Sequence, residues 1–314
     1  MPLVSFINEK KSLVVPRGFT ILKAARAAGV IIESPCGGMG SCGKCGVRVP
    51  DPAHLRSLRL RDTGETRESE TSLNREGEVL ACRTCISGDT DVLVRDYGAE
   101  NRSLKILTGG RNFSYAVDPF IVREGPCFGA VVDIGTTTLA AVLADLHGGA
   151  ELASASALNP QSRYAQDVLS RIHFASGPGG LETLRGTLFE TLRVMIGDLA
   201  AEAGIRREHI YELVFCGNTA MLHLACGADP APLGRFPYTP VIRGGGHAGS
   251  AEEAAAALGI APGGLIYLPP IISAYVGADI SAGILAAELA ERRGTTVFID
   301  IGTNGEIVLA HEGL

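Results

Sequence analysis

The chain has 314 residues, of which 46% are apolar and 20% charged, and its formal net charge is −6. This length and composition suit a globular α/β protein with two domains. The basic residues form no cluster interleaved with aromatic residues, so nucleic acid is not expected as a partner.

The sequence shows no targeting or membrane-spanning pattern. Residues 1–11 lack the charged-then-apolar architecture of a signal peptide. The most apolar tract, residues 265–289, is interrupted by Pro269, Pro270 and Asp279, which is unfavourable for a membrane span. We therefore expect no membrane partner and a location in the reducing cytoplasm.

The first predicted elements are a hairpin and a helix. Residues 3–15 alternate between apolar and polar side chains around a polar turn at 8–11, which predicts two short strands. A short helix is predicted next over residues 20–28, where Thr20 can cap it and Gly29 can end it. A glycine-rich loop follows the helix.

The glycine-rich loop carries Cys36, Cys42 and Cys45, and Cys82 follows after 36 intervening residues. Thiolates are soft ligands for iron, and four of them can hold a [2Fe–2S] cluster. The glycines between them allow positive φ angles and let backbone N–H groups point at the sulfur atoms. The spacing therefore predicts a [2Fe–2S] cluster with these four cysteines as its metal ligands.

Other interpretations of this loop fit less well. Zinc also accepts four thiolates, but structural zinc sites usually combine two short Cys-x2–4-Cys knuckles, so zinc remains the less favoured alternative. The stretch from Gly38 to Lys44 approaches a phosphate-binding Walker A motif, but Cys45 replaces the Ser or Thr that would hold Mg²⁺. A disulfide framework would suit a secreted chain, and nothing in the sequence suggests secretion.

Five residues separate the first two cysteines and two separate the next pair, a spacing that resembles the adrenodoxin branch of the [2Fe–2S] ferredoxins. Residues 80–86 are similar to the strand that carries the last ligand in that branch. The resemblance implies Cys82 as the ligand and Cys85 as a spare thiol. It also implies an α+β fold of the β-grasp type for residues 1–95, in which the polar residues 51–78 form a solvated loop or a docking surface.

After a connector of mixed polarity at residues 96–127, the pattern becomes that of an α/β domain. The predicted strands are residues 128–134, 139–146, 212–215, 265–272 and 296–301. The predicted helices are residues 165–174, 181–203 and 279–292. The longest of them presents an apolar stripe of six residues: Leu184, Leu188, Leu192, Met195, Ile196 and Leu199.

A strand that ends in Asp-Ile-Gly-Thr occurs twice, 167 residues apart, at Asp133 and at Asp300. The N–H groups and hydroxyls of such a turn can hold a nucleotide phosphate, and the aspartate can organise a Mg²⁺ shell. The candidate phosphate and Mg²⁺ residues are Asp133, Gly135, Thr136, Thr137, Asp300, Gly302, Thr303 and Asn304. The alternative is a pair of ordinary hairpin turns with turn-forming aspartates.

The two turns, with a helix start at residues 277–279 between them, resemble the ASKHA superfamily of acetate and sugar kinases, heat-shock 70 chaperones and actin. The resemblance implies phosphate-1 and phosphate-2 motifs and a catalytic, water-orienting carboxylate at Asp279, for which helix capping is the alternative. It implies an α/β ASKHA (actin-like, RNase H-like) lobe at residues 128–293. A second lobe would begin at residues 294–314 and be incomplete, so we expect a fragment.

A [2Fe–2S] domain joined to an ASKHA-type lobe resembles the reductive activators of corrinoid proteins, and the resemblance covers essentially all 314 residues. Residues 159–161, 167–172 and 216–221 are also similar to that family. The resemblance implies single-electron transfer from a low-potential donor to a corrinoid protein, which takes Co(II) to Co(I) and is linked to ATP with Mg²⁺. The alternative is a [2Fe–2S] electron carrier whose α/β domain recognises a partner and binds no nucleotide.

The remaining candidate ligands are interpreted as structural. Four further cysteines are expected to be core thiols: Cys85, Cys127, Cys216 and Cys226. His209 and His223 fall in no metal-ligand spacing and are expected at packing or surface positions. Asn218 and Thr219 stand between a strand and a helix, so they either face the site or cap the helix.

Overall fold

A computed structural model gives the fold of most of the chain. It describes residues 1–30, 32, 34, 38, 40, 43–51, 54, 58–60, 78–94, 118–121, 123–247, 251–302 and 304–314. Three predicted site residues, Cys36, Cys42 and Thr303, lie outside the described residues. Most of the predicted surface loop at 51–78 and of the connector at 96–127 also lies outside them.

The chain divides into two compact units, which are described one at a time. The first unit is Met1–Ser103 with Ser162–Ser170, and the second is Leu104–Gln161 with Arg171–Leu314.

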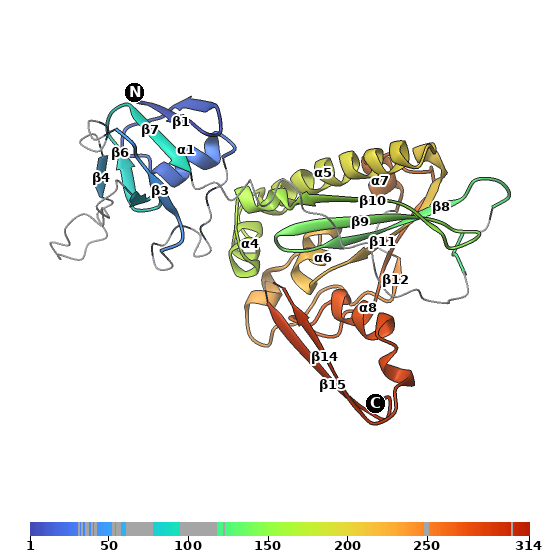
Figure 1. The fold of residues 1–314 in the computed structure, drawn as a ribbon. Coiled ribbons are helices and arrows are strands. Elements are labelled where there is room, and N and C mark those ends of the chain that lie inside the picture. Colours follow the sequence, from blue (N-terminus) through green and yellow to red (C-terminus); the bar gives the residue numbers. More distant parts are fainter. Residues whose placement is uncertain are drawn as a thin grey trace. The chain divides into compact units, whose positions relative to one another are not determined.

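The first unit is built on a five-stranded sheet with the order β2-β1-β7-β3-β5 (Figure 1). Its strands are β1 (Leu3–Phe6), β2 (Lys11–Val14), β3 (Gly46–Arg48), β5 (Glu78–Leu80) and β7 (Thr90–Val94). β1 is antiparallel to β2 and parallel to β7, whereas β3 is antiparallel to both β5 and β7. A second, antiparallel pair consists of β4 (Leu58–Leu60) and β6 (Thr84–Ile86). The predicted N-terminal hairpin is confirmed.

Helix α1 (Ile21–Ala27) supplies apolar side chains to the core of this unit. Thr20 caps the helix as predicted, because its Oγ1 accepts a hydrogen bond of 3.1 Å from Lys23 N. Ile21 on the helix and Phe6 on β1 are both 0% exposed and belong to the same core cluster. Burial of apolar surface therefore holds the helix against the sheet.

Residues 80–86 do not form the single strand that the sequence resemblance predicted. β5 ends at Leu80, residues 81–83 form a turn, and β6 begins at Thr84. Leu80 O accepts two hydrogen bonds that close the turn, one from Arg83 N over 3.0 Å and one from Thr84 Oγ1 over 2.9 Å. Cys82 therefore lies at a corner of the chain between two strands.

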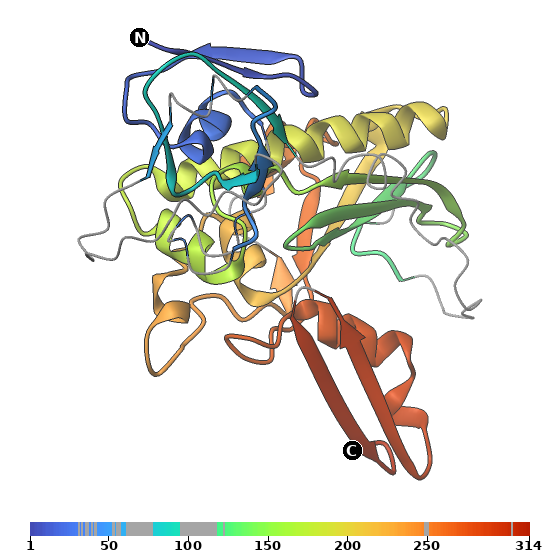
Figure 2. The same cartoon turned by 60° about the vertical axis from the view of Figure 1, so that its left-hand side comes forward.

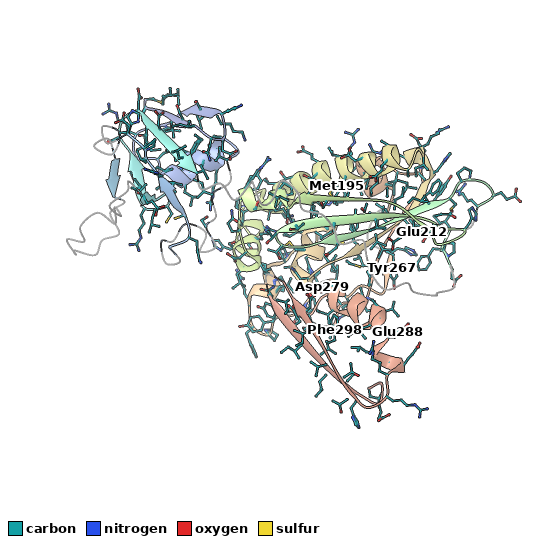
Figure 3. All side chains as sticks on the ribbon, viewed as in Figure 1. Met195, Glu212, Tyr267, Asp279, Glu288 and Phe298 are labelled. Carbon is teal, nitrogen blue, oxygen red and sulfur yellow. The ribbon has the colours of Figure 1, made fainter. Side chains whose placement is uncertain are left out.

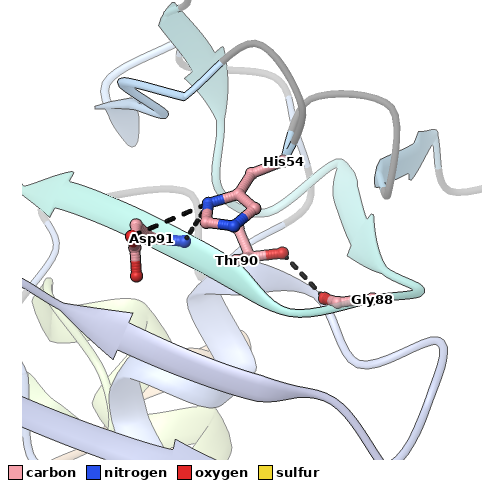
Figure 4. Close-up of polar contacts among 4 residues, drawn as sticks. All are labelled: His54, Gly88, Thr90 and Asp91. Carbon is pink, nitrogen blue, oxygen red and sulfur yellow. Dashed lines mark hydrogen bonds and ion pairs between the residues drawn. The ribbon is translucent and has the colours of Figure 1, made fainter.

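His54 provides a further contact to β7 (Figure 4). Asp91 N donates to His54 Nδ1 over 3.1 Å, and the same ring nitrogen lies 3.8 Å from Asp91 Oδ2. The neighbouring Thr90 Oγ1 donates to Gly88 O over 2.9 Å. Because Nδ1 accepts the backbone N–H, the neutral His54 ring carries its proton on Nε2.

The second unit is built on a six-stranded sheet with the order β10-β9-β8-β11-β13-β12. Its strands are β8 (Phe128–Ile134), β9 (Thr138–Asp145), β10 (Glu151–Leu158), β11 (Ile210–Cys216), β12 (Gly246–His247) and β13 (Leu265–Leu268). β8, β9 and β10 are antiparallel neighbours, β11 and β13 continue the sheet in parallel with β8, and β12 is antiparallel to β13. The carboxyl ends of β8 and β11 thus lie at one edge of the sheet.

Helix α5 (Gly180–Glu202) is the longest helix of this unit and packs against β9 and β10 (Figure 1). All six residues of its predicted apolar stripe are buried. Other helices of this unit are α6 (Thr219–Cys226) and α7 (Ala251–Leu258), and its short 3-10 turns include η2 (Arg207–His209) and η3 (Ala231–Gly234). Helix α4 (Val168–Ala175) and the 3-10 turn η1 (Pro160–Arg163) each have residues assigned to both units.

Two boundaries and one strand differ from the sequence prediction. The helix predicted over residues 165–174 begins only at Val168, because Asp167 Oδ1 accepts a hydrogen bond of 2.9 Å from Ser170 N as a cap does. The strand predicted over residues 265–272 ends at Leu268, just before two prolines that cannot donate to a ladder. β10 was not predicted, because its alternating alanines and serines have weak strand propensity.

The C-terminal part holds helix α8 (Ala278–Ala286), the 3-10 turn η4 (Leu289–Glu291), and an antiparallel pair, β14 (Thr295–Ile301) and β15 (Gly305–His311). Figure 2 shows this hairpin extending away from the six-stranded sheet. The single helix predicted over residues 279–292 is wrong. The helix stops because Glu288 adopts a left-handed φ of 52°, a break that no glycine or proline within residues 284–292 signals.

Contact between α8 and β14 is close. A Cβ atom on Gly283 of α8 would lie 2.5 Å from the ring of Phe298 on β14, so only glycine allows this packing (Figure 3). No helix within the described residues has the length and apolar character needed to cross a membrane.

Candidate functional site

The first candidate site contains the two predicted cluster ligands that the structure describes. Cys45 directly precedes β3, and Cys82 lies in the turn after β5. They are 1% and 2% exposed, and their Sγ atoms are 3.2 Å apart. Ala81 N donates to Cys45 O and Leu22 N donates to Ala81 O, both over 2.9 Å. Backbone hydrogen bonds therefore bring the two thiols, far apart in sequence, to one buried point.

The loop before Cys45 has the backbone conformations that its glycines were predicted to allow. Gly38, Gly40 and Gly43 have φ angles of 98°, 83° and 67°, which side-chain-bearing residues rarely adopt. A Cβ atom on Gly38 would lie 3.1 Å from Leu22 Cδ2, so Gly38 lies directly beside helix α1. Two buried thiols beside such a loop are a donor set that fits an iron–sulfur cluster.

Cys85 has a different setting from Cys82. On β6, Thr84 and Ile86 are buried while Cys85 is half-buried, so its side chain faces the opposite side of the strand. Its backbone forms an antiparallel bridge with Thr20. This arrangement supports the sequence-based assignment of Cys82 as the ligand, which remains a prediction.

The second candidate site begins at Asp133, the penultimate residue of β8. Its side chain keeps solvent access, yet the surrounding protein raises its pKa from 3.8 to about 6, first by desolvation and then through the charges of Asp279 and Asp300. Cys216 stands opposite Asp133 in the parallel register of β8 and β11. Desolvation, together with the charges of Asp133 and Asp279, raises the pKa of the Cys216 thiol to about 11.

Two further carboxylates, Asp279 and Asp300, raise the pKa of Asp133, and Glu306 is coupled to both of them. Asp279 is in the first turn of α8 (Figure 3), and Asp300 stands opposite Glu306 in the register of β14 and β15. Desolvation raises the pKa of Asp279, and the charge of Asp300 raises it further. The pKa of Glu306 is raised by desolvation and then by Asp279 and Asp300. The sequence patterns did not single out Glu306, so its membership in this group was missed.

Mutual repulsion in this group has a chemical consequence. Ionised carboxylates that raise one another's pKa are stabilised by a nearby cation. Within the described residues, however, no three His, Cys, Asp or Glu side chains lie close enough to hold a metal ion by themselves. Mg²⁺ in nucleotide sites is usually held by one or two carboxylates together with water and phosphate oxygens. A cation here would therefore bind with its phosphate ligand.

Three glycines let separate segments meet at this site. A Cβ atom on Gly277 would lie 2.5 Å from Gly217 O, and one on Gly217 would lie 2.6 Å from Ile134 O. Ala278 N donates to Gly217 O over 3.0 Å. The end of β8, the β11–α6 connection and the start of α8 therefore cross at backbone contact distance. A Cβ atom on Gly135 would likewise lie 2.5 Å from Thr138 O, which makes the β8–β9 turn tight.

The predicted phosphate residues of the first turn differ in exposure. Thr136 is only 4% exposed, and its Oγ1 accepts a hydrogen bond of 3.0 Å from Asn218 Nδ2. Thr137 is exposed. Asn218 also caps α6, because its Oδ1 accepts from Met221 N over 3.1 Å. Asn218 therefore fulfils both alternatives that the sequence left open, capping a helix and contacting the turn.

The second turn is more open. Gly302 and Asn304 are exposed, and Gly302 N donates to Asn304 O over 2.9 Å. Asp279 is not the helix cap, since the N-cap position of α8 is Gly277. Ile280 N donates to Asp279 Oδ1 over 2.9 Å, so its carboxylate is oriented by the helix.

The remaining cysteines and His223 have structural surroundings. Burial raises the pKa of Cys127, and it raises the pKa of Cys226 to about 11, so these thiols stay protonated and are poor metal ligands. His223 is 0% exposed. Its Nδ1 bonds to Thr219 O over 2.7 Å and its Nε2 accepts from Val241 N over 2.9 Å. It is a packing residue, as predicted.

The family of the chain follows from its second unit. The model of the RACo middle region matches residues 128–292, more than half of the 314 residues. The chain belongs to the RACo family. A 2Fe–2S iron–sulfur cluster binding domain matches residues 5–87 of this RACo-family chain, a range that includes all four predicted ligand cysteines.

Individual relatives agree with this assignment. The corrinoid activation enzyme RamQ of Eubacterium limosum is 28% identical over 331 aligned residues, which cover 90% of this chain and 55% of that protein. One component of the Na⁺-translocating NADH-quinone reductase of Neisseria gonorrhoeae is 32% identical over 94 residues, which cover 28% of this chain and 20% of that protein. The RACo-family chain thus spans about half the length of the longer-matching relative.

A solved structure supports the predicted fold class. The reductive activator for corrinoid, iron–sulfur protein has a TM-score of 0.56 and 26% sequence identity, and the match covers 99% of this chain and 62% of that one. The predicted order of an α+β ferredoxin domain followed by an α/β domain is confirmed for this RACo-family chain.

Proposed function

We propose that this chain is an iron–sulfur electron-transfer protein that reductively activates a corrinoid protein, taking its cobalt from Co(II) to Co(I). The observation that carries the proposal is the buried pair Cys45 and Cys82, 3.2 Å apart, in a 2Fe–2S domain that is joined to a RACo middle region. Relatives named as a corrinoid activation enzyme and a reductive activator support it. The reducing cytoplasm is the proposed location, because the cysteines that the structure describes are thiols and not disulfides, and thiols remain reduced there.

The proposed cluster ligands are Cys36, Cys42, Cys45 and Cys82. When bound, the cluster supplies a one-electron carrier that takes an electron from a low-potential donor and passes it to the corrinoid cobalt. Leu22 and the core around it exclude water from the two described thiols, and the loop glycines allow backbone N–H groups to approach the sulfur atoms.

The proposed link to ATP rests on the carboxylate group. Asp133 and Asp300 would share a Mg²⁺ that accompanies the nucleotide, and Asp279 would orient the attacking water. The turn residues Gly135, Thr136, Thr137, Gly302, Thr303 and Asn304 would surround the phosphates. The charges of Asp279 and Asp300, which after desolvation raise the pKa of Asp133, support this, because a cation would relieve their repulsion.

There is an energetic reason for such a link. A Co(II)/Co(I) couple lies below the potential of about −400 mV that plant-type ferredoxins have, so electron transfer to cobalt is unfavourable by itself. Nucleotide-driven closure around the partner can offset this difference by changing the cobalt ligation or by trapping the reduced product.

The test is anaerobic reduction of a Co(II) corrinoid protein, followed by its optical spectrum, with the cluster-loaded chain and an excess of low-potential reductant. We expect Co(I) to accumulate with MgATP, and Asp133→Ala to lower the rate at least tenfold. If reduction proceeds equally without ATP and in Asp133→Ala, the chain is a simple electron carrier with a partner-recognition domain. If Co(II) persists under all conditions, the activator function is wrong.

A further inference from the structure

Two buried side chains hold the β8–β9 turn from one side. Asn159 and Arg171 are both 0% exposed. Asn159 Nδ2 donates to Gly135 O over 2.8 Å, and Arg171 Nη2 donates to Thr136 O over 2.6 Å. The backbone N–H of Asn159 donates to Thr137 O over 2.8 Å. Three successive carbonyl groups of the turn are thus bound by these two residues.

The orientation of the carbonyls determines the orientation of the amides. In a planar trans peptide, the N–H of one residue points opposite to the C=O of the residue before it. Because the carbonyls of Gly135 and Thr136 point to Asn159 and Arg171, the N–H groups of Thr136 and Thr137 point the other way. Adjacent outward N–H groups of this kind form an anion-binding concavity.

The two holding side chains are themselves fixed. Arg171 Nη1 donates to Gln161 Oε1 over 3.2 Å and lies 3.0 Å from Met221 Sδ. Gln161 N donates to Asn159 Oδ1 over 3.0 Å. The planar guanidinium can satisfy Thr136 and Gln161 at once, a geometry that the single point of a lysine ammonium cannot reproduce. Its positive charge also lies behind the turn, where it favours an anion in front.

We propose that Asn159 and Arg171 are positioning residues that turn the amides of Thr136 and Thr137 outward to bind the terminal phosphates of a Mg²⁺-bound nucleoside polyphosphate. The proposal rests on the nucleotide link proposed above and deepens it. It assigns the phosphate contact to the backbone of the turn and not to the hydroxyl of Thr136, which is buried and accepts from Asn218.

The variants for the test are Arg171→Lys, which keeps the charge and loses the fork, and Asn159→Asp, which replaces the donor with an acceptor at nearly constant shape. The matched control is Arg185→Lys. Arg185 is half-buried, and like Arg171 it donates to a backbone carbonyl, from Nε to Ala225 O over 3.2 Å, but that carbonyl is on α6. The probes are MgATP and Mg²⁺-pyrophosphate, titrated calorimetrically into the cluster-loaded chain.

The second readout is hydrogen exchange of the Thr136 and Thr137 amides, measured on the unsubstituted chain and on each folded variant, with and without each probe. We expect the probes to slow exchange at these two amides. We expect Arg171→Lys and Asn159→Asp to lower the binding affinity for both probes at least tenfold. Arg185→Lys should change these affinities less than twofold. A role confined to stability would lower the melting temperature without removing the amide protection from folded protein.

The outcomes separate this inference from the proposed function. If MgATP binds but these amides are not protected, or if both variants bind as well as the unsubstituted chain, the positioning role is wrong and the nucleotide link stands. If the unsubstituted chain binds neither MgATP nor Mg²⁺-pyrophosphate, the nucleotide link and this inference fail together, while cobalt reduction without ATP still reports on the electron-transfer function.

Discussion

Asp279, at the start of α8, raises the pKa of Asp133, at the end of β8, although 145 residues separate them in the sequence. The two carboxylates are brought together by the backbone contact of Gly277 with Gly217. The site is therefore assembled at the cost of repulsion between like charges, and its stability should depend on pH and on the charge at either position.

Asp133→Asn should stabilise the protein at pH 7. The pKa of Asp133 is raised from 3.8 to about 6 in the folded state, so its contribution to stability is complete below about pH 4 and is lost as the pH rises through 6. Because the side chain is solvent-accessible, Asp133→Asn should raise the free energy of unfolding by only about 1 kcal/mol at pH 7, and this increase should disappear at pH 4. Chemical denaturation at both pH values measures the free energy of unfolding. Asp198→Asn, an exposed position on α5, is the control and should show no such gain.

Cys82→Ser should lose the visible absorption of the cluster and the rhombic EPR signal that appears after reduction. Cys85→Ser should retain both, because Cys85 faces the other side of β6. The two proteins are purified anaerobically and compared for iron and sulfide content. A colourless Cys85→Ser protein beside a normal Cys82→Ser protein would overturn the ligand assignment.

Gly277→Ala should destabilise the protein by about 2–4 kcal/mol, because the new methyl group would meet the backbone of Gly217 and Asn218. Gly186→Ala is the matched control on α5. A Cβ atom there meets nothing within 4 Å, so alanine should stabilise the helix by about 0.5–1 kcal/mol. Urea denaturation of both proteins gives the difference. Equal free energies of unfolding would show that the crossing of the three segments is not tightly packed.

The contribution of His223 to the stability of the protein should fall as the pH drops below 6.5. Desolvation lowers the folded-state pKa of His223, against raising effects from its bond to Thr219 and the charge of Asp229. Its contribution is therefore complete above pH 6.5 and declines as the pH falls toward the folded-state pKa. Protonation of Nε2 also breaks the bond that this atom accepts from Val241 N.

His223→Gln checks this. The variant should be less stable than the unsubstituted chain at pH 7.5, by about 1–3 kcal/mol, because buried N–H groups lose their acceptor. Its free energy of unfolding should change less between pH 7.5 and pH 5.5. An unchanged pH dependence in His223→Gln would show that other groups produce the decline.

Local patterns in the sequence predicted the cluster ligands and most elements of the fold. The spacing of Cys36, Cys42 and Cys45, the period of the apolar stripe on α5 and the repeated Asp-Ile-Gly-Thr turns act over a few residues, so they can be recognised without knowing what packs against them. Glu288 and β10 show the limit of this reasoning. Glu288 has a left-handed backbone although it is not a glycine, and β10 forms a strand although it is rich in Ala and Ser. Contacts with distant segments, and not the local sequence, stabilise both conformations.

Only the tertiary structure decided how the second site is assembled. It placed Glu306 with Asp279 and Asp300, gave Asn218 two roles, and buried Thr136. These outcomes depend on contacts between segments far apart in the chain, such as Gly217 with Gly277. No local pattern encodes such contacts, because they arise when buried polar groups must find partners and separate backbones must pack without voids.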